Sequence, residues 1–260
     1  EAIRRRHHYG TTGTRIYLDV QARFAAPALV YPRDPLWFDA QPEKSSKAVM
    51  GDIVQIYDTD IIVSVAIKSS VPIERVELYD TTTLLETIRF YRAEDLQNRI
   101  RIVWEGAEYK GRGRTVYWNG GLDLQSNSIN HFSPINFKNI EQRPTLLSNK
   151  KLSWNSVTTG NFLGIDLWLD DPEAGTVSFK TNQLSFDLPI SEIGMDDRVF
   201  DAGGLGKRVR IFRLPAEMAP QKYYFERPVS IRADGDTRIY VKVILEDGHA
   251  AWSSPMYFFK

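Results

Sequence analysis

The sequence predicts a mainly β protein built of antiparallel β-sandwiches, with the end of a short helix at its N-terminus. Short runs rich in Val, Ile, Thr, Tyr and Trp are separated by Gly, Pro, Asn and Asp, the composition of strands and of the turns between them. The chain lacks the alternation of strand and helix patterns that a parallel α/β sheet requires. About a dozen strand-like runs in succession favour antiparallel sheets packed face to face.

The first residues have the pattern of a helix end followed by a strand. Arg4–Arg6 suit the negative C-terminal end of a helix dipole, and Gly10 can end the helix. Residues 14–20 then alternate apolar and polar side chains with the period of a half-buried strand. Because no methionine starts the sequence, we expect this chain to be the back portion of a longer polypeptide.

Residues 21–47 are predicted to be a proline-rich linker or wrapping segment. Four prolines lie between residues 25 and 47, and proline both removes a backbone donor and opposes regular structure. Residues 48–260 are predicted to form the β-sandwich region. Any division of that region is expected near 139–149, where Pro, Asn and charged residues collect.

The strand pattern is clearest after residue 60. In residues 61–68 every second side chain is apolar, which is typical of a sandwich strand. Glu246–His249 predicts a tight hairpin, because its Asp-Gly pair accepts positive φ at little cost. Pro189–Asp197 has the pattern of a short helix. Strands are expected at residues 61–68, 73–79, 83–90, 99–104, 115–124, 151–157, 164–169, 175–180, 207–214, 223–231, 237–245 and 250–259.

Charge and composition exclude several classes of partner. The 33 basic and 33 acidic residues balance, so the chain has no net positive charge that would attract it to nucleic acid or to an anionic membrane. No apolar run approaches the roughly 20 residues that span a bilayer, so no membrane span is expected. The chain has no cysteine, which excludes disulfides and thiolate chemistry and leaves both cytoplasm and periplasm open.

The sequence contains no recognisable reaction centre. His7 and His8 are adjacent and point in different directions on regular backbone, while His131 and His249 have no partner at ligand spacing. We therefore expect neither a metal ligand nor a cofactor site in this chain.

Paired acidic residues are interpreted as turn formers. Asp170-Asp171, Asp196-Asp197 and the Asp234-Gly-Asp236 segment lie beside glycine, proline or other turn residues, where Asp bonds its own backbone. An autonomous hydrolase that uses such a pair needs two carboxylates about 5 to 10 Å apart across a cleft, and the sequence does not indicate one. An autonomous hydrolase is therefore the weakest of the functions that we consider.

Two loops carry groups that can bind anions or form turns. Arg112 and Arg114 stand in the segment Lys110-Gly-Arg-Gly-Arg, which could hold a phosphate or carboxylate but lacks the ending of a P-loop. A charged hairpin loop or a donor of ion pairs between domains is favoured. No recognisable motif places a general base beside the hydroxyls of Thr11, Thr12 and Thr14. Turn formation is therefore their expected role.

The six tryptophans suggest either core packing or a sugar-stacking platform. Most lie within expected strands, where filling a sandwich core is the default. Trp37, in the proline-rich segment, is the best candidate for docking onto another domain. Trp118 and Trp37 are the residues that a sugar platform would use.

Several segments together resemble the C-terminal half of the DUF3604 family, large bacterial proteins related to PHP-type metal-dependent hydrolases. The matching segments span nearly the whole chain; they are Arg4–Ile16, Pro72–Glu77, Val103–Arg114, Ser156–Gly160 and Asp247–Pro255. In that family a PHP barrel binds divalent metals through His-x-His and later ligands, and a strand-rich part follows. This chain has no His-x-His, so none of its residues is assigned as a metal ligand from the resemblance.

The resemblance implies that residues 1–20 are the tail of an upstream PHP-like barrel and that the rest is its β-rich companion. We therefore expect a noncatalytic accessory region that shapes or covers an active site upstream, with the divalent metal and the catalytic domain in that upstream part. The alternative is a carbohydrate- or surface-binding β-sandwich module. The residues expected to contact the upstream site are Tyr9, Thr11, Thr12, Arg15, Arg112 and Arg114.

Overall fold

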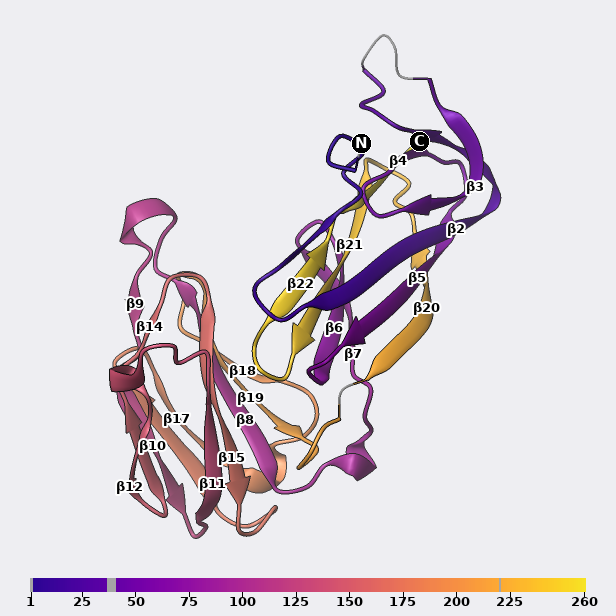
Figure 1. Cartoon of the computed structure of the whole chain (residues 1–260). Coiled ribbons are helices and arrows are strands. Elements are labelled where there is room, and N and C mark those ends of the chain that lie inside the picture. Colours follow the sequence, from indigo (N-terminus) through magenta and orange to yellow (C-terminus); the bar gives the residue numbers. More distant parts are fainter. Residues whose placement is uncertain (1, 37–40, 220) are drawn as a thin grey trace. The chain divides into compact units, whose positions relative to one another are not determined.

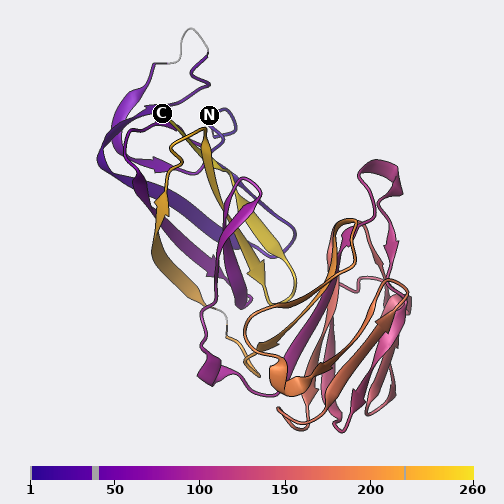
Figure 2. The ribbon, with the colours of Figure 1, turned by 180° about the vertical axis from the view of Figure 1, so that it is seen from behind.

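The computed structural model describes residues 2–36, 41–219 and 221–260, and it confirms a mainly β fold with antiparallel sheets. Strands make up 57% of the chain and helical turns 5%. The chain divides into two compact units, which we call the first sandwich (1–90 with 219–260) and the second sandwich (91–218). Figures 1 and 2 show the strands of both units from opposite sides.

The first sandwich is an eleven-stranded sheet that folds over on itself into two layers. One layer contains β2, β3, β5 and β20, and the other contains β6, β7, β21 and β22. The parallel pair of β23 and β4 connects them. The strands are β1 (Tyr9–Thr11), β2 (Ile16–Tyr31), β3 (Glu43–Val49), β4 (Ile53–Gln55), β5 (Asp60–Ser69), β6 (Ile73–Asp80), β7 (Thr83–Ile88), β20 (Lys222–Ser230), β21 (Thr237–Leu245), β22 (Ala250–Ser253) and β23 (Met256–Phe259).

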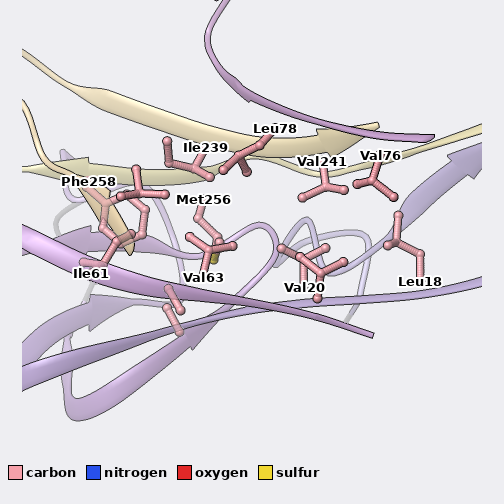
Figure 3. Close-up of a cluster of buried hydrophobic side chains, with 14 of the residues drawn as sticks. Leu18, Val20, Ile61, Val63, Val76, Leu78, Ile239, Val241, Met256 and Phe258 are labelled. Atoms are coloured by element: carbon pink, nitrogen blue, oxygen red, sulfur yellow. The ribbon is translucent and has the colours of Figure 1, made fainter. Parts of the chain in front are cut away.

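Alternating apolar side chains form the core between these layers. Figure 3 shows Leu18 and Val20 of β2, with Ile61 and Val63 of β5, facing side chains of β6, β21 and β23. All four are at most 1% exposed. Because successive strand residues point to opposite faces, the even positions of β2 and the odd positions of β5 are buried together. Each such side chain contributes about 1.5–3 kcal/mol when fully buried.

The prediction that residues 21–47 are an irregular linker is wrong for much of that segment. β2 continues to Tyr31 and β3 begins at Glu43. β2 stops pairing with β5 at Arg23, and its register with β3 is interrupted between Arg23 and Ala28. Pro27 lies within this interruption and is therefore tolerated in β2. At that point the sheet does not require the backbone donor that proline lacks.

The expected helix end takes the form of a turn. No helix is assigned within residues 2–8, but His7 N donates to Ala2 O (2.9 Å) and Arg6 N donates to Ile3 O (3.2 Å). Arg6 has a φ of +59°. This combination is the Schellman motif that closes the C-terminus of a helix. The terminating position is thus Arg6, and not Gly10, which belongs to β1.

The expected boundary after residue 20 is also wrong. β1 pairs with β22, and the first half of β2 pairs with β5, so residues 9–20 are part of the first sandwich. Long-range pairing decides this, and a local pattern cannot show it.

The second sandwich consists of two five-stranded sheets and a two-stranded β9–β14 ladder. The sheet orders are β12-β13-β10-β16-β17 and β11-β15-β8-β19-β18. Its strands are β8 (Arg99–Ala107), β9 (Val116–Tyr117), β10 (Gly120–Gln125), β11 (Ile129–Ile135), β12 (Thr145–Ser148), β13 (Lys151–Trp154), β14 (Val157–Thr158), β15 (Phe162–Leu169), β16 (Thr176–Thr181), β17 (Ser185–Pro189), β18 (Arg198–Asp201) and β19 (Leu205–Leu214), and its 3-10 turns are η1 (Ala93–Asp95), η2 (Gly111–Gly113), η3 (Ile140–Gln142) and η4 (Ile190–Glu192).

Aromatic side chains fill the core of the second sandwich. Trp104 stacks on Trp154 with ring centroids 4.7 Å apart, and Phe179 lies 5.5 Å from Trp154. Trp104 belongs to one five-stranded sheet, and Trp154 and Phe179 belong to the other. The expected helix at 189–197 is only the single turn η4, whose Ile190 is buried in this core.

The second sandwich is an insertion between β7 and β20 of the first. The division expected near 139–149 is wrong, because that segment contributes η3 and the edge strand β12 to the second sandwich. At the real boundary, Phe90 stacks on Tyr223 with centroids 3.5 Å apart. The two ends of the insertion therefore lie close together in the first sandwich, a geometry that tolerates domain insertion.

The hairpin expected at 246–249 is confirmed. Leu245 N donates to His249 O, Gly248 N donates to Leu245 O, and Gly248 has a φ of +84°. The turn joins β21 to β22, which pair antiparallel.

Replacing residues 91–218 by a short Gly/Ser linker should leave a folded first sandwich, because the residues flanking the insertion already lie side by side. Circular dichroism and a cooperative thermal transition measure this. A matched deletion of residues 83–218, which also removes edge strand β7, serves as the more disruptive control. An unfolded 91–218 deletion variant would contradict the insertion model.

Candidate functional site

The N-terminal turn is held against the turn between β3 and β4. Arg6 Nε donates to Gly51 O (2.8 Å), and His7 Nε2 lies 2.7 Å from Asp52 Oδ1. Asp52, only 4% exposed, also accepts a hydrogen bond from Val49 N. Gly51 has a φ of +96°, and a Cβ atom there would lie 2.3 Å from Arg6 O. Glycine is therefore required where the two backbones meet.

The segment after this turn clasps the hairpin that joins β21 and β22. Thr12 Oγ1 lies 3.2 Å from His249 Nδ1 and accepts a hydrogen bond from Ala250 N (3.0 Å). Thr14 Oγ1 donates to Asp247 Oδ2 (2.9 Å). Gly13 packs directly on the His249 ring, since a Cβ at that position would lie 2.3 Å from it. The structure thus gives His249 partners that its position in the sequence did not indicate.

The Thr12, His249 and Asp247 cluster is not arranged as a nucleophilic relay. Asp247 Oδ1 accepts from the backbone N–H of His249 (2.9 Å), so this oxygen supports the hairpin turn. A relay needs the carboxylate on the imidazole ring and the hydroxyl on its other nitrogen. The cluster therefore acts as a tie between the N-terminal segment and the hairpin.

The structure divides the predicted contact residues between the two sandwiches. Tyr9 donates its hydroxyl hydrogen to Ile16 O (2.9 Å), while the Thr11 and Arg15 side chains are exposed, all in the first sandwich. Arg112 and Arg114 are exposed at η2 of the second sandwich. Tyr9 and Thr12 are thus structural, and the other four are available at the surface.

Among the acidic pairs, Asp171 shapes a turn as expected, whereas Asp197 pairs with Arg210 and Asp236 pairs with Arg238. Asp171 Oδ1 accepts hydrogen bonds from Glu173 N (2.8 Å) and Ala174 N (2.9 Å). These bonds hold the pKa of Asp171 below its usual value. Within the described residues, no group of three or more His, Asp or Glu side chains is arranged to hold a metal ion.

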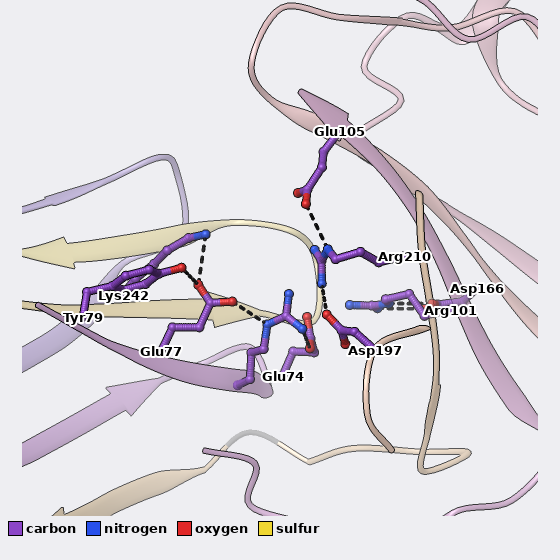
Figure 4. A network of polar contacts seen from close by, with 10 residues as sticks. Glu74, Glu77, Tyr79, Arg101, Glu105, Asp166, Asp197, Arg210 and Lys242 are labelled. Atoms are coloured by element: carbon purple, nitrogen blue, oxygen red, sulfur yellow. Dashed lines mark hydrogen bonds and ion pairs between the residues drawn. The ribbon is translucent and has the colours of Figure 1, made fainter. Parts of the chain in front are cut away.

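A charged network on one face of the β11-β15-β8-β19-β18 sheet was not predicted. Asp166 accepts two hydrogen bonds from Arg101 (2.7 and 2.8 Å) and one from Arg99. Glu105 binds Arg208 (2.6 Å) and Arg210 (3.0 Å). Figure 4 shows the Asp166–Arg101 and Glu105–Arg210 contacts. Arg99 and Arg101 alternate with buried Ile100 and Ile102 along β8, and this alternation of charged and apolar residues is the signal from which the network could have been inferred.

The arginines keep both carboxylates ionised. Burial by itself raises the pKa of Asp166, but Arg101 and Arg99 more than offset it, so the pKa lies below the ordinary 3.8. Burial likewise raises the pKa of Glu105, and Arg210 and Arg208 reverse the effect. A carboxylate with a lowered pKa and saturated hydrogen bonds is a poor general acid or base near pH 7. The network ties β8 to β15 and β19 and so stabilises the sheet.

A second network lies on β6 and β21 of the first sandwich (Figure 4). Glu77 accepts hydrogen bonds or ion pairs from Arg75 (3.0 Å), Tyr79 (2.8 Å) and Lys242 (3.3 Å). Tyr79 also stacks on Tyr240. Burial, followed by the charge of Glu77, raises the pKa of Tyr79, so its phenol stays protonated and donates.

Three of the tryptophans are too buried to take part in a sugar platform. Trp104, Trp118 and Trp154 are at most 4% exposed. The indole N–H of Trp118 donates to Thr158 Oγ1 (2.9 Å), and that of Trp104 donates to Ser156 Oγ (3.0 Å). Core packing is thus confirmed for these three, and a platform that uses Trp118 is ruled out. Trp37 lies outside the described residues.

Comparison with known proteins identifies no relative: no family model, curated protein or solved structure matches this chain. Across residues 2–36, 41–219 and 221–260, none of the helical turns has the length and apolar character needed to cross a bilayer.

Asp166→Asn should lower the free energy of unfolding by about 3 kcal/mol at pH 7, because it leaves two buried guanidinium groups without their carboxylate. The folded-state pKa is below 3.8, so this stabilisation is present above the unfolded value and is lost as pH falls through the folded value. Urea unfolding at pH 7 and pH 3 should therefore show a smaller difference between variant and wild type at pH 3.

Asp123→Asn is the matched control for this measurement. Asp123 also faces a cation across a strand pair, 2.9 Å from Lys151, but the two side chains are 30% and 55% exposed. Its loss should cost less than about 1 kcal/mol. Equal costs for both variants would contradict the stabilising role of the buried network.

Gly51→Ala should release the N-terminal turn, because the added Cβ overlaps Arg6 O and the positive φ is strained. Trypsin cleavage after Arg5 and Arg6 should become about tenfold faster at 25 °C. Gly10→Ala is the control, since no atom lies within 4 Å of a Cβ at that position. Unchanged cleavage of Gly51→Ala would show that the turn is not anchored there.

Proposed function

We propose that this chain is a noncatalytic β-rich accessory region of a PHP-like metal-dependent hydrolase, which shapes or covers an active site in an upstream domain of the same polypeptide. The observation that carries the proposal is the Schellman turn of residues 2–7, docked on the first sandwich. The resemblance of Arg4–Ile16 to the family segment after the PHP barrel falls on the same residues.

The turn can hold a preceding helix in a fixed orientation on the first sandwich. Its hydrogen bonds are those that satisfy the last carbonyl groups of a helix. Arg6 and His7 tie it to the backbone of Gly51 and to the buried carboxylate of Asp52. A helix that precedes residue 2 would therefore be joined to the first sandwich without a flexible linker. Such a rigid junction suits a companion domain that must be held beside an active site.

The noncatalytic role is supported by the partners of the potentially reactive side chains, which already bind other groups of the fold. Asp166 and Glu105 are bound by arginines, and Asp171 by backbone amides. Thr12 and His249 bind each other in the clasp described above. These groups are engaged in holding the fold, so the proposed divalent metal and its ligands belong to the upstream domain.

A second candidate function is a carbohydrate- or surface-binding module. An exposed groove on the first sandwich, lined by three tyrosines and two lysines, favours it. The two functions are compatible, because an accessory domain can also bind a polymer that carries the substrate.

The chain alone should show no metal-linked rise in melting temperature with 1 mM manganese or zinc, while a protein extended by its encoded upstream sequence should show one and should retain metal after gel filtration. Differential scanning calorimetry and elemental analysis measure these effects. An extended protein without bound metal, or an upstream sequence without a histidine and aspartate cluster, would overturn the proposal. So would stoichiometric metal on the 260-residue chain.

A further inference from the structure

A groove of about 530 Å³ lies on the outer face of the β2-β5-β20 layer of the first sandwich. Tyr17, Lys68, Lys222 and Tyr224 surround it, and Ala66 lies between them. The alternation that buries Leu18 of β2 turns Tyr17 outward, so the groove follows directly from the strand pattern.

The strand register places the four large side chains in a fixed pattern. Tyr17 is opposite Lys68, Lys68 is opposite Lys222, and Ala66 is opposite Tyr224. The tyrosines are thus two strands and two residues apart, a Cα separation of roughly 12 Å on an ideal sheet. The methyl side chain of Ala66 leaves the space between them open. Two rings at this spacing can contact two units of an extended chain of sugars.

The tyrosine rings are accessible for stacking. Tyr17 is 55% exposed and Tyr224 is 65% exposed. The Tyr224 hydroxyl donates to Glu226 Oε1 (2.5 Å), and Arg23 holds the other oxygen of Glu226 (2.7 Å). This chain of contacts orients the Tyr224 ring and leaves its face free. Pre-oriented aromatic rings contribute contact area at a small entropic cost.

The lysines indicate that the ligand is anionic. Lys68 and Lys222 are directly opposite each other, and like charges in this position destabilise a sheet. Within the described residues, no carboxylate lies within ion-pair distance of either amine. An anionic group bound between them would relieve the repulsion and form charge-assisted hydrogen bonds.

We propose that this groove binds an acidic oligosaccharide, with sugar rings on Tyr17 and Tyr224 and a uronate carboxylate at Lys68 and Lys222. This inference rests on the second candidate function and not on the accessory role. The carboxylates of Asp19 and Glu226 on the same face can accept hydrogen bonds from sugar hydroxyls, whereas the phosphates of a nucleic acid offer them no donor. The balanced total charge of the chain also disfavours nucleic acid.

Isothermal titration of the whole chain with an alginate hexasaccharide tests the proposal, with maltohexaose as the neutral probe. We expect saturable binding of the acidic sugar, at least about tenfold weaker binding of the neutral one, and a loss of affinity in 0.5 M salt. Tyr17→Ala and Tyr224→Ala should each weaken binding about tenfold. Lys68→Gln should weaken it about fivefold and reduce the salt dependence.

The control variants lie on the same sandwich but outside the groove. Tyr57→Ala removes another exposed ring, 80% exposed, and Lys47→Gln removes another exposed charge. Both should bind within about twofold of wild type, and circular dichroism should show all variants folded. The proposal is overturned by no binding at 5 mM sugar, by equal affinity for both sugars, by unchanged affinity in the tyrosine variants, or by equally tight binding of an oligothymidylate. None of these results alters the metal test of the accessory role, so the two proposals fail separately.

Discussion

The pairing and burial of β2 is the constraint on which the first sandwich depends. This one strand pairs with β3, β4 and β5, and its inward side chains fill the core against β6, β21 and β23. The same alternation presents Tyr17 to solvent beside buried Ile16 and Leu18. A slip of one residue in register would exchange the two faces, losing the core and the groove together. Stability and the proposed binding surface therefore have a single structural origin.

Polar groups in this protein are used to connect segments that lie far apart in the sequence. The N-terminal turn is tied to Asp52, and Thr12 is tied to the hairpin at His249. In the second sandwich, Asp166 joins β15 to β8 through Arg101. The buried carboxylates among them, Asp52 and Asp166, would each cost about 1–3 kcal/mol if left without a partner. Their structural use is the reason why the chain is proposed to be an accessory region and not the enzyme.

The errors of sequence-based reasoning have a common physical cause. Proline normally disfavours a strand, but Pro27 lies where β2 has no ladder bond to lose. A turn can end at a non-glycine residue, as at Arg6, when tertiary contacts stabilise its positive φ. The composition of 139–149 resembles a linker, yet its backbone is used in an edge strand. In these cases the contacts of the folded chain outweighed a weak local preference.

The sequence by itself determined the fold class, most of the strands and the 246–249 hairpin, because apolar alternation and the Asp-Gly turn are local properties with a large energetic effect. It also indicated that the tryptophans Trp104 and Trp154 fill a core. Only the tertiary structure decided that the second sandwich interrupts the first, and that Tyr17, Lys68 and Tyr224 share one groove. Strand neighbours are chosen by the total area that packing buries, and this quantity is not encoded in any single segment of the chain.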